Sequence, residues 1–236
     1  MEQVRVKLLE KLERTSSVFS FRFSYAKKID FVPGQFLQII FDENNAPNKE
    51  LNKYLSFSSS PSKDYIEVTK RISSSGFSKR LLDLIPGQEV LIKAPFGNCI
   101  FRAEDKKILF LIGGIGITPV ISIIEYVVEK KLDNDIMLIY SNRSEEDIAF
   151  KRELDMWQNR SNLKIFYTVT DCQPQTQSCI FGRIDEELIR SKIKDLNERQ
   201  VFIFGPPKMV EAMKDLCCQQ MLCNKDRVKI ESFLGY

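Results

Sequence analysis

Two glycine-containing turns offer the most specific chemistry in this sequence. One spans residues 113–119 (GGIGITP), the other spans residues 205–207 (GPP), and each follows a short apolar run. Glycines let backbone amides approach a pyrophosphate, and a helix that starts at such a turn adds partial positive charge. The first turn lacks the Gly-x-Gly-x-x-Gly spacing of the common dinucleotide fingerprint, so alone it could be a packing feature. Two such turns on one sheet favour a dinucleotide-binding crevice.

Hydroxyl groups supply a second candidate site. Residues 54–61 read YLSFSSSP, a dense run of serines that follows a tyrosine. This run either forms an edge strand with a solvated turn, or it ends a strand whose hydroxyls and amides meet a polar ligand. The residues alone leave both interpretations open.

The chain contains no histidine. Its absence excludes Ser-His-Asp and Cys-His nucleophile systems and every metal site that depends on imidazole. The six cysteines include no Cys-x-x-Cys pair and match no iron–sulfur spacing, so we expect no metal site. Chemistry must therefore come from carboxylates, hydroxyls, thiols, backbone amides or a bound cofactor.

Charge and hydropathy disfavour several partners and locations. The net charge of +3 includes no basic block, which gives nucleic-acid binding no support. Residues 108–124 are uncharged, but glycines and a proline interrupt them, so we expect no membrane span. The amino terminus lacks the apolar segment of a signal peptide, and Cys217, Cys218 and Cys223 fit buried thiols on a helix. These features predict a cytoplasmic protein.

A length of 236 residues allows one large domain or two modest ones, and the pattern changes near residue 102. Before this point, short strands of period two alternate with turns such as Pro33-Gly34 and Pro86-Gly87. The predicted strands span residues 3–9, 18–24, 36–41, 54–58, 65–71 and 89–93, with one short helix at 78–84. Short strands at this density predict a small barrel or sandwich.

After residue 102, apolar strands alternate with helices. The predicted strands span residues 108–112, 136–140, 163–169, 201–204 and 228–233. Helices are predicted from Thr118-Pro119, from a capping box at residues 144–147 through Trp157, after Asp185, and from residue 206 to about 222. Strands joined by crossover helices predict a doubly wound parallel sheet, in which ligands bind beyond the carboxyl ends of the strands.

Together these pieces resemble the ferredoxin–NADP reductase family over nearly the whole chain. Residues 31–36 (FVPGQF) resemble its strand entry, residues 53–56 (KYLS) take the place of its Arg-x-Tyr-Ser flavin motif, and residues 76–78 (GFS) match its flavin-phosphate segment. Residues 94–97, 113–119, 205–207 and 231–233 resemble four further motifs, which include the nicotinamide pyrophosphate loop, the Cys-Gly-Pro turn and the closing acidic and aromatic residues. The resemblance depends on the order in which these motifs occur along the chain.

The resemblance implies a fold and a division into domains. Residues 1–102 would form a six-stranded antiparallel Greek-key barrel that binds FAD rather than FMN. Residues 103–236 would form a five-stranded, doubly wound α/β domain that binds NADPH or NADH.

The resemblance also implies site residues. At the reacting centre it places Ser56 near the flavin N5, Glu231 as a proton or charge partner, and Phe233 as the closing aromatic. For the flavin it implies Lys53, Tyr54, Leu55, Ser56, the backbone of Val68, Thr69, Lys70 and Arg71, and Gly76, Phe77 and Ser78. For the nicotinamide nucleotide it implies Gly113, Gly114, Gly116, Ile117, Thr118, Pro119, Ser141, Arg143, Gly205 and Pro206, with Tyr236 as a second candidate ring cover.

Three residues depart from the family pattern. Lys53 replaces an arginine, so a phosphate contact there loses the bidentate fork. Leu55 replaces the tyrosine that packs on the flavin, and Phe204 replaces the cysteine near the nicotinamide. Residues 234–236 extend past the closing aromatic, so either Phe233 or Tyr236 could cover the ring.

The implied activity is hydride transfer from NADPH or NADH to bound FAD, followed by electron transfer to an external acceptor. That acceptor would be a one-electron protein such as ferredoxin, or a small molecule. Arg143 could meet a 2′-phosphate, or it could be a solvated loop residue. Two other functions stay open: an electron-transfer subunit of a larger redox complex, and a non-catalytic dinucleotide sensor that kept the fold.

Overall fold

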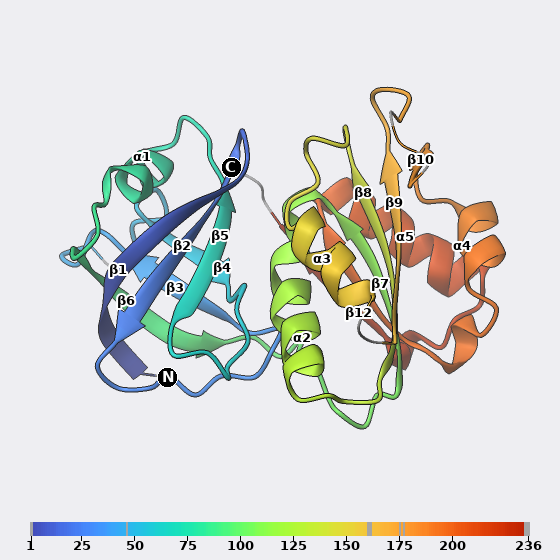
Figure 1. Cartoon of the computed structure of the whole chain (residues 1–236), viewed down its shortest axis with the longest axis horizontal. Helices are drawn as coiled ribbons and strands as arrows, with labels where there is room; N and C mark the ends of the chain where they lie inside the picture. The colour runs from blue at the N-terminus through green and yellow to red at the C-terminus, as the bar shows by residue number, and fades with distance from the viewer. Residues whose placement is uncertain (1, 46, 160–161, 175, 177, 234–236) are drawn as a thin grey trace. The chain divides into compact units, whose positions relative to one another are not determined.

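The computed structural model describes residues 2–45, 47–159, 162–174, 176 and 178–233. The chain divides into two compact units (Figure 1). Unit 1 contains the chain up to Phe101 together with Thr118–Tyr126, and unit 2 contains Arg102–Ile117 together with the chain from Val127 on. Each unit has its own sheet and its own hydrophobic core.

Unit 1 is built on a six-stranded sheet with strand order β4-β3-β6-β1-β2-β5. Its strands are β1 (Glu2–Thr15), β2 (Val18–Tyr25), β3 (Phe36–Ile40), β4 (Asn52–Ser56), β5 (Ile66–Arg71) and β6 (Glu89–Phe96), and its first helix is α1 (Gly76–Asp83). The strands within it pair antiparallel, and a bridge between Phe57 and Val68 joins the chain after β4 to β5. The predicted antiparallel Greek-key barrel is confirmed.

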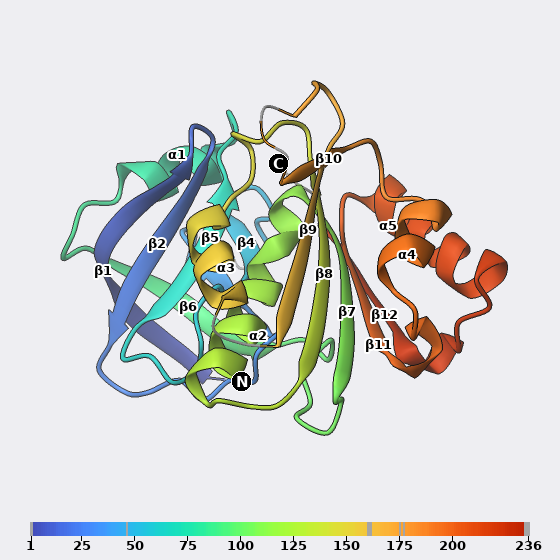
Figure 2. The same cartoon turned by 45° about the vertical axis from the view of Figure 1, so that its right-hand side comes forward.

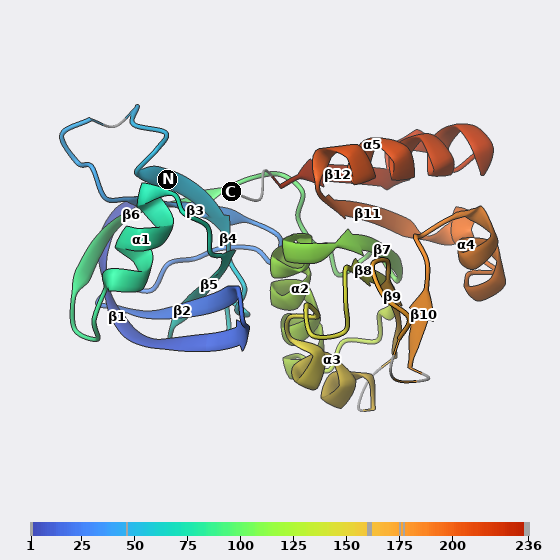
Figure 3. The same ribbon diagram turned by 90° about the horizontal axis from the view of Figure 1, so that it is seen from above.

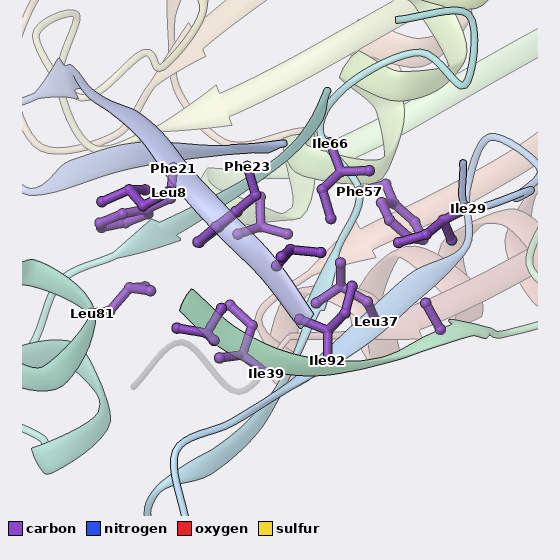
Figure 4. Close-up of a cluster of buried hydrophobic side chains, with 14 of the residues drawn as sticks. Leu8, Phe21, Phe23, Ile29, Leu37, Ile39, Phe57, Ile66, Leu81 and Ile92 are labelled. Carbon is purple, nitrogen blue, oxygen red and sulfur yellow. The ribbon is translucent and has the colours of Figure 1, made fainter. Parts of the chain in front are cut away.

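The barrel core forms because alternate side chains of each strand point inward (Figure 4). Phe21 and Phe23 of β2 are buried, and the rings of Phe31 and Phe57 stack with centroids 3.8 Å apart. Leu81 of α1 is fully buried in the same core. Burial of side chains this large stabilises the unit by roughly 1.5–3 kcal/mol for each side chain.

Strand β1 is longer than its hydropathy predicts. The sequence predicts a strand over residues 3–9, but β1 continues to Thr15 and pairs with β2 over its whole second half. Residues 10–15 read EKLERT, and their charges mask the alternation on which the prediction depends. Register shifts between Leu8 and Glu10 and between Glu13 and Thr15 further disturb the period of two.

Unit 2 contains a six-stranded parallel sheet with strand order β10-β9-β8-β7-β11-β12 (Figure 2). Its strands are β7 (Lys107–Gly113), β8 (Asp135–Asn142), β9 (Leu163–Val169), β10 (Cys179–Phe181), β11 (Gln200–Gly205) and β12 (Val228–Ser232). The order reverses between β7 and β11, as in a doubly wound sheet. All five predicted strands are present, and the predicted count of five is wrong by one because β10 has only three residues.

Helices of unit 2 lie on both faces of this sheet. The helical elements after β7 are η1 (Gly114–Ile117), α2 (Thr118–Glu129), α3 (Lys151–Gln158), α4 (Glu186–Lys192), η2 (Leu196–Glu198), α5 (Pro207–Asp215), η3 (Leu216–Gln220) and η4 (Lys225–Arg227). α4 and α5 cover one face and share a core with alternate residues of β7, β8 and β11, whereas α3 lies on the other face (Figure 3). Within the described chain, no helix has the length and apolar character that crossing a bilayer requires.

The predicted capping box before α3 is wrong. α3 begins at Lys151, and the Ser144 hydroxyl meets the Asp147 carboxylate at 3.4 Å instead of capping a helix. Phe150 is buried and adopts a left-handed backbone conformation with φ of 61°, which interrupts any helix that starts earlier. Burial of Phe150 thus outweighs the local capping signal.

The helix predicted over residues 206 to about 222 is divided. α5 ends at Asp215 and continues as the π-helical turn η3. Cys217 and Cys223 are buried, as predicted, whereas Cys218 is partly exposed and Cys223 lies beyond the helix. The pattern therefore predicted the buried face of this segment but not its end.

A buried arginine holds the amino-terminal edge of the parallel sheet. Arg199 is 2% exposed and pairs with Asp195 and Asp135, each at 2.7 Å. Its guanidinium also donates to the carbonyl oxygens of Ile108 and Asp135, where β7 and β8 begin. Burial acts to raise the pKa of Asp195, but hydrogen bonds from Arg199 and Lys107 lower it to about 2. Arg199 therefore joins three strands at their start.

We predict that Arg199→Ala destabilises unit 2 by about 1–3 kcal/mol, because it removes a buried side chain and the guanidinium donor to the carbonyl oxygens of Ile108 and Asp135. Trp157 is the only tryptophan and lies on α3, so its fluorescence follows the unfolding of unit 2 in urea. Arg190→Ala is the matched control, since the exposed pair of Arg190 with Glu186 contributes only about 0.3–0.5 kcal/mol. An equal effect of the two substitutions would contradict the prediction.

Candidate functional site

The two glycine-containing turns meet where the strand order of unit 2 reverses. A Cβ atom on Gly205, at the end of β11, would lie 3.2 Å from the backbone nitrogen of Gly113, at the end of β7. A Cβ atom on Gly116 would lie 2.6 Å from the carbonyl oxygen of Phe204. Both distances are shorter than ordinary contacts, so the two turns touch through their backbones.

This contact decides between the two interpretations of the first turn. Two of its glycines have a packing role, because a Cβ on Gly116 would meet the backbone of Phe204 and a Cβ on Gly113 would meet the side chain of Met209. The same contact places both turns at the carboxyl edge of the sheet, at the switch in strand order where open α/β sheets bind ligands. Gly114 also adopts φ of 50°, a conformation that favours glycine. A packing role and a ligand-binding role are therefore compatible at this turn.

The closing residues assemble beside these turns. Glu231 of β12 lies opposite Phe204 of β11, and the backbone amide of Phe233 donates to the carbonyl oxygen of Gly205 at 2.8 Å. The rings of Phe233 and Phe204 meet edge to face with centroids 6.3 Å apart. Burial raises the pKa of Glu231 from 4.5 to about 7. A carboxyl group with this pKa can hold or release a proton near neutral pH.

Phe204 and Tyr236 occupy positions that the sequence places near the nicotinamide ring. Phe204 is fully buried, so its side chain belongs to the core of unit 2, and the position does not present a side chain to a ligand as the family's cysteine does. Tyr236, the second candidate ring cover, lies outside the described residues.

Ser141 and Arg143 lie at the carboxyl end of β8. Ser141 is the second-last residue of the strand and is partly buried, and Arg143 directly follows the strand and is exposed. The carbonyl oxygen of Arg143 accepts hydrogen bonds from the backbone amides of Thr170 (3.2 Å) and Asp171 (2.9 Å), which joins this loop to the one after β9. Arg143 therefore combines a fixed backbone with an exposed side-chain charge.

The sequence motifs do not indicate the residue between Ser141 and Arg143. Asn142 is 6% exposed, and within the described part of the chain its side-chain oxygen and nitrogen have no hydrogen-bond partner. Thr168, near the end of β9, is likewise buried with an unpartnered hydroxyl. Buried polar atoms without partners are costly, which marks this edge of the sheet as a place that a polar ligand or water would complete. The sequence signal that could have identified Asn142 and Thr168 is a polar residue at the end of an apolar strand.

In unit 1, the predicted flavin residues follow strand β4. Ser56 is buried at the end of β4 opposite Phe36, and Leu55 packs on the barrel core opposite Leu37. Tyr54 is 57% exposed, and its ring meets those of Phe36 and Phe96 edge to face. The replacement of the family's tyrosine by Leu55 thus leaves an aliphatic contact at that position.

Two lysines gather positive charge beside β4. Lys70 on β5 is 6% exposed, and its ammonium donates to the carbonyl oxygen of Arg71 at 3.0 Å. Burial, and then the neighbouring charge of Lys53, lower the pKa of Lys70 to about 8. An anion beside two neighbouring ammonium groups would be favoured, so Lys53 and Lys70 fit a phosphate.

Helix α1 begins in a cluster of serine hydroxyls. Ser75 caps the helix by accepting from the backbone amide of Ser78 at 3.2 Å, and its hydroxyl lies 3.1 Å from those of Ser73 and Ser78. Ser78 is fully buried, and Phe77 packs in the barrel core. The side chains of Phe77 and Ser78 therefore serve the fold, and their part in phosphate binding would fall to the backbone. Gly76 leads into the helix, where partial positive charge favours an anion.

The predicted side chains of β5 are also engaged by the fold. Val68 lies in the barrel core, and the Thr69 hydroxyl bonds to neighbouring serine hydroxyls. At these two positions the backbone would be the part of β5 that faces a flavin. The remaining residues of the nucleotide turn, Ile117, Thr118 and Pro119, are buried. The site residues thus form two groups, one around β4, β5 and α1 and the other around the turns after β7 and β11, and both fit phosphate-bearing ligands.

Two family models match adjoining parts of the chain. The oxidoreductase FAD-binding domain matches residues 3–101, and the oxidoreductase NAD-binding domain matches residues 110–215. The chain belongs to the ferredoxin–NADP reductase family. FAD and a pyridine nucleotide are the ligands of these two domains.

Members of this family include relatives of known activity. The glycine betaine monooxygenase reductase subunit of Pseudomonas aeruginosa (strain UCBPP-PA14) is 29% identical over 221 residues, which are 89% of this chain and 59% of that protein. The NADH-cytochrome b5 reductase-like protein of Arabidopsis thaliana is 31% identical over 166 residues, 68% of this chain and 50% of that one. This chain therefore spans about half to three fifths of the length of these two relatives.

Solved structures of the family share the fold. The FAD/NAD-binding domain of nitric oxide dioxygenase from Vibrio cholerae aligns with a TM-score of 0.84 at 18% identity, covering 98% of both chains. The ferredoxin–NADP⁺ reductase of Plasmodium falciparum with 2′P-AMP aligns with a TM-score of 0.80 at 18% identity, covering 98% of this chain and 97% of the other.

The raised pKa of Glu231 predicts how stability depends on pH. The folded protein favours the neutral form, so the contribution of Glu231 is complete below pH 4.5 and is lost as pH rises through about 7. Glu231→Gln keeps a neutral side chain and should escape this loss, which we expect to be roughly 1–3 kcal/mol for a partly exposed group. Urea unfolding followed by Trp157 fluorescence at pH 5 and pH 8 measures the difference.

Glu187→Gln is the control for this prediction, because Glu187 is an exposed carboxylate of the same unit. It should preserve the pH profile of the wild type. A stability difference between wild type and Glu231→Gln that stays constant from pH 5 to pH 8 would show that the folded protein does not raise this pKa.

Proposed function

We propose that the chain is an FAD-dependent NAD(P)H reductase that passes electrons to an external acceptor. The observation that carries this proposal is the meeting of two glycine turns with Glu231 and Phe233 at the switch point of the parallel sheet. The FAD-binding and NAD-binding family models support it. In this proposal residues 1–102 hold the flavin and residues 103–236 hold the nicotinamide nucleotide.

Residues of unit 1 would hold FAD. Lys53, Lys70 and the amino end of α1 would bind its diphosphate, and the backbone of β5 would meet the polar edge of its ring. Ser56 would donate its hydroxyl near N5. When bound, the flavin supplies an acceptor for a hydride and a donor of single electrons.

Residues of unit 2 would hold and orient the nicotinamide nucleotide. The backbone of the Gly113 and Gly205 turns would bind the pyrophosphate, and Phe233 would cover the ring and exclude water. Glu231, with a pKa of about 7, would hold a proton beside the reacting atoms.

The proposed class of electron acceptor rests on the names of the relatives and not on a site of this chain. The Pseudomonas aeruginosa relative is the reductase subunit of a monooxygenase, and one solved neighbour is the ferredoxin reductase of a carbazole dioxygenase. We propose a one-electron acceptor protein for this chain as well. Because that relative is itself a reductase subunit, the second candidate for this chain is an electron-transfer subunit of a larger complex. All six cysteines are free, which supports a cytoplasmic location.

The direct test is to load the purified chain with FAD and mix it anaerobically with NADPH or NADH. We expect the flavin absorbance to bleach, and ferricyanide to restore it, because the chain supplies both binding sites. A non-catalytic dinucleotide sensor would bind nucleotide without bleaching. Failure to retain FAD after reconstitution would reject the proposal.

Arg143 tests the choice of nucleotide. We propose that its exposed guanidinium meets the 2′-phosphate of NADPH, since the backbone around it is held by the loop after β9. Arg143→Ala should then raise the KM for NADPH by roughly tenfold, the value of one charge-assisted hydrogen bond, and leave the KM for NADH unchanged. Steady-state reduction of ferricyanide measures both constants. An unchanged ratio would remove Arg143 from nucleotide selection, and Arg152→Ala on α3 is the control for a general loss of positive charge.

A further inference from the structure

A buried carboxylate lies beneath the flavin segments of unit 1. Glu67 of β5 is 2% exposed and accepts hydrogen bonds from two arginines: Arg22 at 2.8 Å, and Arg14 at 3.2 Å from each carboxylate oxygen. The guanidinium of Arg22 also lies over the ring of Tyr65, 4.7 Å from its centroid. Burial acts to lower the pKa of Arg22, but the hydrogen bond and charge of Glu67 raise it above its ordinary value. The Glu67 carboxylate is thus held in place by two guanidinium groups.

A chain of buried hydroxyls continues from this carboxylate. The Ser58 hydroxyl donates to Glu67 at 3.2 Å and lies 2.7 Å from the hydroxyl of Thr69, which in turn lies 2.6 Å from that of Ser20. Arg14 completes the ring by donating to Ser20 at 2.8 Å. Four strands, or the residues directly after them, therefore share one polar network: β1, β2, β4 and β5.

The network acts directly on the two segments to which we assign the flavin ring. Ser58 follows Ser56 by two residues, and its backbone amide donates to the carbonyl oxygen of Glu67 at 2.7 Å. The backbone amide of Glu67 donates to the hydroxyl of Ser59 at 2.9 Å. Thr69 belongs to the stretch of β5 whose backbone would meet the polar edge of the ring. Glu67 thus sets the position of the end of β4 against β5.

The polar network lies where the two edge strands of the sheet meet. β4 and β5 are the two ends of the sheet order, and the bridge between Phe57 and Val68 is the pairing that joins them. A buried ion pair is weak evidence for stability, because well-packed apolar residues often do as well. A hydrogen-bonded ion pair is directional, because its hydrogen bonds fix angles and strand register that apolar contacts do not fix.

We propose that Glu67 is a positioning residue for the flavin. Through Ser58 and Thr69 it fixes the end of β4 against β5, so that the Ser56 hydroxyl and the β5 backbone face N5 and the polar edge of the ring together. This inference rests on the proposed function and adds a residue that touches neither FAD nor nucleotide.

The experiment compares three variants of the full chain after loading with FAD. Glu67→Gln removes the charge at nearly constant volume, and Ser58→Ala removes one hydroxyl of the network. Glu10→Gln is the matched control, because Glu10 is the other carboxylate bound to Arg22, at 2.7 Å, but is exposed and lies on β1. For each we measure the Kd for FAD, the limiting rate of flavin reduction by NADPH, the KM for NADPH, and the urea midpoint.

We expect Glu67→Gln and Ser58→Ala to raise the Kd for FAD and to lower the limiting reduction rate, each by about tenfold, because small misplacements of a reacting ring slow its reaction strongly. The KM for NADPH should stay within about twofold, since the nucleotide residues are untouched. Glu10→Gln should match the wild type in all three constants. A merely structural Glu67 would lower the urea midpoint without changing the reduction rate of FAD-loaded protein.

Two results would overturn the inference. One is an unchanged reduction rate in both network variants while the wild type bleaches normally, which leaves the proposed function intact. The other is an equal effect in Glu10→Gln, which would trace the change to Arg22 alone. Should Glu67→Gln fail to fold, Ser58→Ala decides between these results. A wild type that never bleaches rejects the reductase function itself, together with this inference.

Discussion

The architecture of unit 2 depends on direct backbone contact between two strand ends. β7 and β11 are neighbours at the point where the sheet reverses its order, and both end in glycine. A Cβ at Gly116 would come within 2.6 Å of a carbonyl oxygen, so no side chain fits between the turns. Once the turns are this close, β12 adds Glu231 and Phe233 beside them through its pairing with β11. The fold and the proposed nucleotide site therefore share one steric requirement.

Much of this could be predicted because the signals were local and repeated. The strands of unit 1 alternate in hydropathy, and the turns between them carry Pro-Gly or Asn-rich sequences. The apolar strands of unit 2 are followed by strong helix signals, such as the Asp185 cap, which accepts from the amide of Leu188 as a cap should. The order of the motifs then indicated the family, which the domain matches show.

What could not be predicted depends on contacts distant in sequence. The Ser144 capping signal lost to burial of Phe150 in a left-handed conformation, and neither the burial nor the φ angle is visible in the local pattern. Phe204 stands at a motif position, yet its ring belongs to the core. Glu67 is a single charge in a strand sequence, and it becomes the centre of a network because Arg14 and Arg22, 53 and 45 positions away in the sequence, donate to it.

Arg199 lies at the amino-terminal edge of the parallel sheet, and the glycine turns lie at the opposite, carboxyl-terminal edge. Structural reinforcement and ligand chemistry are therefore separated by the full length of the strands. This separation makes the two ends independently adjustable. A substitution around Arg199 would therefore change the stability of unit 2 without reshaping the proposed nucleotide site, and a substitution in that site would leave the Arg199 contacts in place.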